Sequence, residues 1–354
     1  MSREATVASH FETILRGFEH VQENLLFHRV GAAQTDLHTT VSEPLEALQA
    51  LLAEAADDES AGLYRELREP VELLRDARDA FLRRDRDFTL SFFAMRRSFS
   101  RAVPLLYRLR RRLPSLTPYW FEASALARAE ALETEQPGSE PVGLVAKERC
   151  AEHAEYALYV PESYTADRQW PLILCLHGGH GREDEYLWTW MRTAKSHAQF
   201  VLSAKSLDLT WAFGNPEADF GSVLSMLDDV AARYAIDRSR ILLTGLSDGG
   251  TFTYLLGLRH AERFAALAPI AAAGFHPMID MLLHEGAGKD RPIHIVHGVH
   301  DAIFPVATAR VTHQLLERIG YAVTYRELPD WGHAYPYSIH ENIVFPWYNA
   351  QIGE

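Results

Sequence analysis

Ser247 lies in a run of residues whose types could make its hydroxyl a nucleophile. The apolar, β-prone run at residues 241–244 stops at Gly245, and an amphipathic helix pattern begins directly after the serine. This pattern predicts a very tight strand-to-helix turn with a strained serine at its apex, which leaves no room for side chains two residues before and two after it. Gly245 and Gly249 occupy those two places. The sequence therefore predicts a nucleophile elbow.

A glycine-rich segment at residues 177–181 follows another apolar run, at 172–176. Its free N–H groups could stabilise a developing negative oxygen. In sites built on such an elbow, one donor comes from a loop of this kind and the second from the residue after the nucleophile, so we expect the oxyanion hole at Gly179 and Asp248. A phosphate cradle is the alternative, but no Lys-Ser or Lys-Thr pair closes the segment as a P-loop requires.

A base and an acid for Ser247 are predicted on two further segments. Asp301 follows an apolar run at residues 293–296, and His333 lies on a glycine-containing segment after the last β-prone run. The carboxylate would orient the imidazole, and the imidazole would accept the serine proton. The chain order serine, aspartate, histidine is that of one known arrangement of catalytic triads. Asp330 is the rival acid, but so close to His333 it is expected to cap its own loop.

Histidines near Asp301 also invite a metal interpretation. His294 and His297 lie at an odd spacing on the predicted strand, which places their side chains on opposite faces and prevents shared chelation. His297 and His300 are expected to form hydrogen bonds within their loop. Neither a metal nor an organic cofactor is expected.

The elements that must position these residues alternate between strand and helix patterns from residue 142 to 354. Such alternation predicts an α/β domain with a mostly parallel, doubly wound sheet, whose reactive residues gather at the carboxyl ends of the strands. Expected strands lie at residues 142–147, 155–160, 172–176, 200–204, 241–244, 265–270, 293–296 and 322–328. Expected helices lie near 183–198, 220–234, 249–259, 305–319 and 339–349.

The region at residues 1–135 instead carries apolar residues at helical spacing and predicts an all-α bundle. One helix is expected to start with Ser42 as N-cap and Pro44 in its first turn, another is expected to kink or end at Pro104, and a last one is expected at 117–133. Residues 136–141 interrupt the helical pattern and predict a linker. The bundle could cap the site, form a homodimer interface or shield an edge of the sheet.

Taken together, the elbow, the glycine-rich loop, and the segments that bear Asp301 and His333 resemble the phospholipase/carboxylesterase branch of the α/β-hydrolases, whose kin include acyl-protein thioesterases, feruloyl esterases and polyhydroxybutyrate depolymerase-like enzymes. The resemblance covers about residue 141 to the C-terminus. Asp248 stands where the thioesterases usually have glutamine, and their minimal form lacks the helical N-terminal region. The resemblance implies an α/β-hydrolase fold preceded by the helical bundle.

The function expected from these residues is hydrolysis of a small or medium carboxylic ester through an acyl-enzyme intermediate. Two alternatives stay open. One is a serine peptidase or amidase of the prolyl-oligopeptidase type, and the other is a non-catalytic binding or scaffold protein on the same fold. Aromatic residues near the predicted strand ends could line a substrate pocket, and Trp211 and Trp331 are the best candidates.

Composition limits the partners and the location. The formal net charge of −13 argues against nucleic-acid binding by the whole chain. The sequence has no apolar run long enough to span a membrane, and its start lacks an apolar signal core. With two cysteines and no disulfide framework, a cytoplasmic protein is expected.

Overall fold

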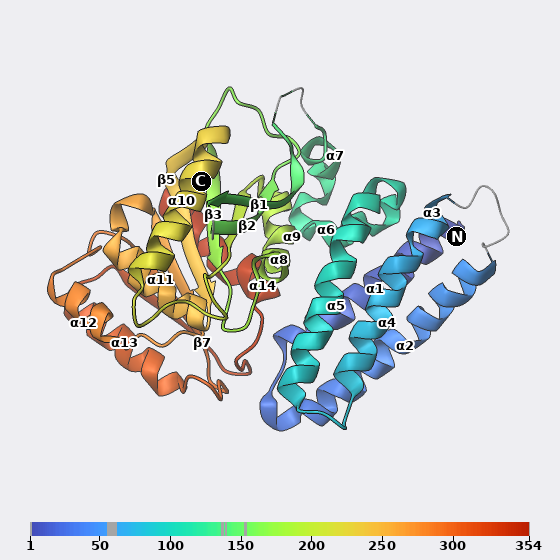
Figure 1. Cartoon of the computed structure of the whole chain (residues 1–354), viewed down its shortest axis with the longest axis horizontal. Helices are drawn as coiled ribbons and strands as arrows, with labels where there is room; N and C mark the ends of the chain where they lie inside the picture. Colours follow the sequence, from blue (N-terminus) through green and yellow to red (C-terminus); the bar gives the residue numbers. More distant parts are fainter. Residues whose placement is uncertain (1, 55–61, 136–137, 139, 152–153, 354) are drawn as a thin grey trace. The chain divides into compact units, whose positions relative to one another are not determined.

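The computed structural model divides the chain into two compact units, residues 1–126 and 127–354, which we call the helical unit and the α/β unit. It describes residues 2–54, 62–135, 138, 140–151 and 154–353. Residues 136, 137 and 139 of the predicted linker lie outside the described residues. Figure 1 shows both units, coloured along the sequence.

The helical unit is built from long amphipathic helices whose apolar faces form its core. Phe11, Ile14 and Phe18, spaced at one helical turn, are fully buried, and the Phe18 ring packs against Phe99 with 5.3 Å between centroids. The helices are α1 (Arg3–Glu23), α2 (Val30–Glu54), α3 (Gly62–Glu66), α4 (Arg68–Leu82), α5 (Phe88–Leu109) and α6 (Thr117–Trp120).

Two helix predictions in this region are wrong, and the expectation that a helix would end at Pro104 is not met either. Ser42 and Pro44 do not begin a helix, because α2 starts at Val30 and passes through both. Its buried stripe runs on across the proline, so tertiary packing outweighs the lost backbone hydrogen bond. Likewise, α5 continues beyond Pro104 to Leu109. The helix expected at 117–133 is instead a series of short turns, because Phe121 adopts an extended backbone directly after α6.

The described residues of the α/β unit form an eight-stranded sheet in the order β1-β2-β4-β3-β5-β6-β7-β8. Strand β2 runs antiparallel to both its neighbours, and all later pairs are parallel. The strands are β1 (Gly143–Ala151), β2 (Ala154–Val160), β3 (Trp170–Leu176), β4 (Phe200–Ala204), β5 (Ile236–Leu246), β6 (Ala266–Ile270), β7 (Ile293–Gly298) and β8 (Val323–Leu328).

Helices cover the sheet on both faces, as Figure 1 shows. Every residue of β3, β4, β6 and β7 is buried, which explains why β3 and β6 are continuous apolar runs and why the other two are mostly apolar. Helices α10 to α13 contribute to one large apolar core with alternate strand residues. The helices are α7 (Ala129–Leu132), α8 (Glu183–Tyr186), α9 (Met191–His197), α10 (Glu217–Arg233), α11 (Asp248–Arg259), α12 (Pro277–His284), α13 (Val306–Arg318), α14 (Tyr337–Ile339) and α15 (Phe345–Ile352).

The helices of this unit differ from prediction at three places. The helix expected at 183–198 is split into α8, a 3-10 turn and α9. The one expected at 339–349 contains a π-helical turn at His340–Val344 between α14 and α15. Helix α12 was not predicted. All three departures lie outside the segments that carry the expected site residues.

Candidate active site

Ser247 occupies a strained turn between β5 and α11. Its backbone has φ 59° and ψ −121°, a conformation that costs a non-glycine residue about 1–3 kcal/mol. A Cβ at Gly245 would lie 2.3 Å from the Gly249 carbonyl oxygen, and one at Gly249 would lie 2.3 Å from the carbonyl oxygen of Leu176. Both positions therefore require glycine, as the sequence predicted for a nucleophile elbow.

Asp301 and His333 form a hydrogen-bonded pair. His333 Nδ1 lies 2.8 Å from Asp301 Oδ2. The other carboxylate oxygen accepts the backbone N–H groups of Ile303 at 2.9 Å and Phe304 at 2.7 Å. These amides hold the buried carboxylate in one orientation and leave Oδ2 to the imidazole. The rival acid, Asp330, is exposed.

The nucleophile and this pair lie at the same edge of the sheet. Ser247 follows β5, Asp301 follows β7 and His333 follows β8, and these strands are parallel. In the described part of the chain, no hydrogen bond joins Ser247 Oγ to the imidazole of His333. Such bonds are often long in unliganded sites and tighten when substrate binds.

The glycine-rich loop packs against the elbow. A Cβ at Gly178 would lie 3.3 Å from Ser247 Cβ, and one at Gly179 would lie 2.6 Å from Asp248 Oδ2. A side chain at either position would crowd the nucleophile or its neighbour, so the backbone of this loop is what meets the elbow. The assignment of Gly179 and Asp248 as oxyanion donors stays a prediction.

Two histidines near the site, His177 and His297, are buried, and burial favours the neutral imidazole of each. His297 Nε2 donates to the Phe304 carbonyl oxygen at 2.7 Å, and burial lowers the pKa of this imidazole. Burial lowers the pKa of His177 to about 4. Among the described residues, no cluster of three or more histidine, cysteine or acidic side chains could hold a metal ion.

The two tryptophans predicted to contact substrate are buried. Trp211 is 1% exposed, donates its Nε1–H to the His177 carbonyl oxygen at 2.8 Å and stacks on Phe252 with 4.9 Å between centroids. Trp331 is 5% exposed, and its backbone carbonyl accepts the N–H of His300 at 3.0 Å. The contact of either tryptophan with substrate stays a prediction.

The sequence did not predict the residues that form hydrogen bonds to the glycine-rich loop and to the residue after the nucleophile. Thr210 Oγ1 donates to Asp248 Oδ2 at 2.5 Å, and Ser206 N–H donates to His177 Nε2 at 3.2 Å. Thr210 is 38 positions from its partner. No local pattern marks such a contact.

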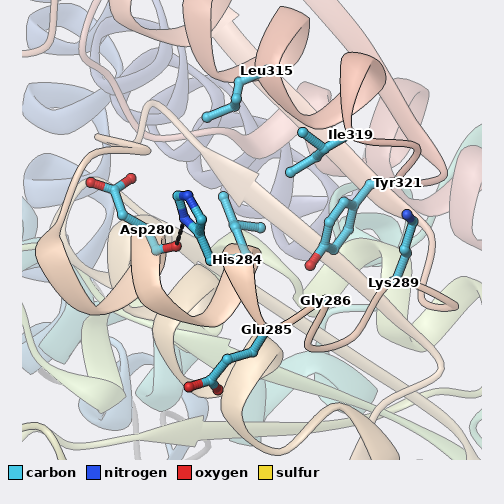
Figure 2. Close-up of a pocket in the computed structure, with 9 residues that line it drawn as sticks. Asp280, His284, Glu285, Gly286, Lys289, Leu315, Ile319 and Tyr321 are labelled. Atoms are coloured by element: carbon cyan, nitrogen blue, oxygen red, sulfur yellow. Dashed lines mark hydrogen bonds between the residues drawn. The ribbon is translucent and has the colours of Figure 1, made fainter.

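A separate pocket of about 450 Å³ lies between α12 and α13 (Figure 2). It is lined by Asp280, Leu283, His284, Glu285, Gly286, Lys289, Leu315, Ile319 and Tyr321. These residues precede β7 and β8, whereas Asp301 and His333 follow them, so the pocket is at the opposite edge of the sheet from the elbow. None of the predicted site residues lines it.

The strand order, the antiparallel β2 and the elbow after β5 define an α/β-hydrolase fold in the α/β unit. Residues 218–344 match the sequence model of the phospholipase/carboxylesterase family. None of the helices in the described ranges is long and apolar enough to cross a membrane.

Similar proteins are described as esterases and thioesterases. A probable feruloyl esterase C of Aspergillus terreus is 26% identical over 160 residues, which are 43% of this chain and 56% of that protein. The chain thus spans about half the length of this relative. Acyl-protein thioesterase 1 of Gibberella zeae is 29% identical over 97 residues, which are 27% of this chain and 41% of that protein. A crystal structure of a thermostable esterase has 27% identity and a TM-score of 0.47, with coverage of 55% of this chain and 58% of that one.

Proposed function

We propose that this protein is a carboxylic-ester hydrolase with Ser247, His333 and Asp301 as its catalytic triad. Ser247 attacks the ester carbonyl while His333 accepts its proton, and Asp301 holds the imidazole and stabilises its cation. The backbone N–H groups of Gly179 and Asp248 stabilise the oxyanion. His333 then returns the proton to the departing alcohol, and water releases the acid from the acyl-enzyme.

The observation that carries this proposal is the Asp301–His333 pair, which lies at the same edge of the sheet as the strained Ser247. The pair is joined at 2.8 Å and its carboxylate is buried. A strained serine and an imidazole oriented by a buried carboxylate are the parts that acyl transfer requires.

The proposed substrate is a small or medium carboxylic ester. The relatives support an ester because they are described as a feruloyl esterase and an acyl-protein thioesterase. These names apply to those proteins, and they cover only part of this chain.

A panel of nitrophenyl esters of increasing acyl length, aryl esters and aminoacyl-nitroanilides tests the proposal. We expect hydrolysis of esters that is lost in Ser247→Ala. Turnover of the anilides alone would assign the site to a peptidase. No turnover of any substrate by folded protein would favour a binding or scaffold role.

For the helical unit we propose a role as a cap that shapes substrate choice, with a homodimer interface or an edge shield as the competing roles. Removal of residues 1–126 should then broaden the acyl-length preference. An unaltered preference in a soluble fragment would argue against the cap, and a dimer that becomes monomeric would support the interface. We also propose a cytoplasmic location. The net charge of −13 further supports the absence of a nucleic-acid partner.

A further inference from the structure

The segment between β4 and α10 runs alongside the glycine-rich loop and is bonded to it three times. The N–H of His180 donates to the Leu209 carbonyl oxygen at 2.7 Å. The indole Nε1–H of Trp211 donates to the His177 carbonyl oxygen at 2.8 Å, and the N–H of Ser206 donates to His177 Nε2 at 3.2 Å. Residues 206–211, which we call the bracing segment, thus contact both ends of the loop that bears Gly179.

The bracing segment also contacts the residue after the nucleophile. Thr210 Oγ1 donates to Asp248 Oδ2 at 2.5 Å. The same carboxylate oxygen lies 2.6 Å from the position that a Cβ on Gly179 would occupy. The carboxylate therefore fills the space beside Gly179, and the Thr210 hydroxyl fixes its position. The carboxylate that Thr210 holds therefore belongs to one predicted oxyanion donor and packs beside the other.

The bracing segment is itself held independently of the loop. Asp219, fully buried at the start of α10, accepts the N–H of Leu207 at 3.0 Å and that of Ala212 at 2.7 Å. The Trp211 ring stacks on Phe252 of α11 with 4.9 Å between centroids. Contacts from α10 and α11 thus hold the segment from outside the loop, so it can serve as a rigid support.

We propose that the bracing segment positions the oxyanion hole, with Thr210 acting through Asp248 and Trp211 acting through His177. This role requires no contact of either side chain with substrate, so both act here as positioning residues. This inference rests on the proposed esterase function for its kinetic consequence, but the structural coupling can be measured without any turnover.

The kinetic consequence follows from where the donors act. Oxyanion donors stabilise charge that develops only in the transition state, so their misalignment lowers kcat more than it changes KM. Thr210→Val keeps the shape of the side chain and removes the hydroxyl donor. We expect kcat to fall by about tenfold or more with KM within about twofold, because loss of a whole oxyanion donor costs about 10²–10³ in rate. Thr210→Ser restores the hydroxyl and should recover most of the loss.

A matched control separates positioning from general loss of stability. Thr324 Oγ1 lies 2.7 Å from His294 Nδ1, at the start of β8 and away from the elbow. Thr324→Val removes one hydroxyl, as Thr210→Val does, together with its hydrogen bonds to His294 Nδ1 and to the Ile293 carbonyl oxygen. The control should lose stability and keep the kcat of the unaltered protein.

Hydrogen–deuterium exchange of the backbone at residues 177–181 tests the coupling in the full chain. If Thr210 supports this loop, the amides of the loop should exchange about fivefold faster in Thr210→Val, a change that corresponds to the loss of one hydrogen bond. In Thr210→Ser and Thr324→Val they should exchange at the rate of the unaltered protein. Unchanged exchange in Thr210→Val would overturn the inference, whether or not the protein hydrolyses esters.

The two proposals fail in different ways. Faster exchange in a protein that hydrolyses no ester would support the role of Thr210 in holding the loop and would contradict the proposed esterase function. Faster exchange with unchanged kcat in an active esterase would overturn the role of Thr210 in positioning the oxyanion hole and leave the esterase intact. A fall of kcat in Thr324→Val equal to that in Thr210→Val would show a general effect of lowered stability. This result would also overturn the role of Thr210 in positioning the oxyanion hole.

Discussion

Gly249→Ala tests whether the elbow depends on close approach of two backbones. The added Cβ would lie 2.3 Å from the carbonyl oxygen of Leu176 and 2.5 Å from that of His177, whereas ordinary contact begins at 3.4 Å. Both obstacles are backbone atoms, which cannot rotate away, so the turn and β3 must separate by about 1 Å. Overpacking of this kind typically lowers the free energy of unfolding by about 1–3 kcal/mol. We expect a loss of about 3 kcal/mol in Gly249→Ala, because no side chain can move aside.

A matched control is available in α10. Gly221 is exposed in the interior of this helix, and nothing lies within 4 Å of a Cβ placed there. Gly221→Ala should therefore stabilise the protein by about 0.5–1 kcal/mol through helix propensity. The same substitution is thus expected to have opposite signs at two positions in one unit.

Urea unfolding followed by tryptophan fluorescence measures both changes. Six of the seven tryptophans lie in the α/β unit, so the signal reports mainly on that unit. Ester hydrolysis by Gly249→Ala should also be lost, because the displaced turn carries Ser247. Equal stability of Gly249→Ala and Gly221→Ala would refute the steric explanation of the elbow.

Three further predictions address the acid, the buried histidine and the helical unit. Asp301→Asn should lower kcat for nitrophenyl esters by about 10⁴ with the circular dichroism spectrum unchanged, since the imidazole then adopts the wrong tautomer; nearly unchanged kcat would assign the acid to another residue. Burial lowers the pKa of His177 to about 4, whereas it is about 6.5 in the unfolded chain. As the pH decreases, the unfolded state therefore binds the proton first. The stability of the folded state thus falls as the pH decreases from about 6.5 towards 4. Urea unfolding of His177→Asn should therefore show roughly 2 kcal/mol less loss between pH 7 and pH 5 than the unaltered protein, and an equal loss would contradict this. Pro44→Ala should raise the thermal midpoint of the helical unit, because a proline inside a helix costs about 3 kcal/mol; a lower midpoint would mean that the helix depends on the proline.

The sheet and the elbow could be predicted because local residue types determine them. Strands buried on both faces need continuous apolar runs, and residues 172–176 and 200–204 show this pattern without tertiary information. Gly245 and Gly249 are required by the geometry of the turn itself. The pairing of Asp301 with His333 was predicted from chain order, and the structure joins them at 2.8 Å.

Other features depend on packing between distant segments, which local patterns do not report. Pro44 favours a helix start on its own, but the buried stripe of α2 carries the helix through it. The bond from Thr210 to Asp248 joins residues from different loops, and a threonine before a tryptophan gives no signal of it. The close approach of Gly179 to the Asp248 carboxylate likewise appears only in the folded chain.

Reaction with a fluorophosphonate probe tests the central claim most directly, because the probe labels only a serine that a neighbouring base activates. We expect one label per folded chain, located by peptide mass spectrometry on Ser247. The label should be absent in Ser247→Ala and form much more slowly in His333→Asn. A folded protein that stays unlabelled, or a label on another serine, would contradict it.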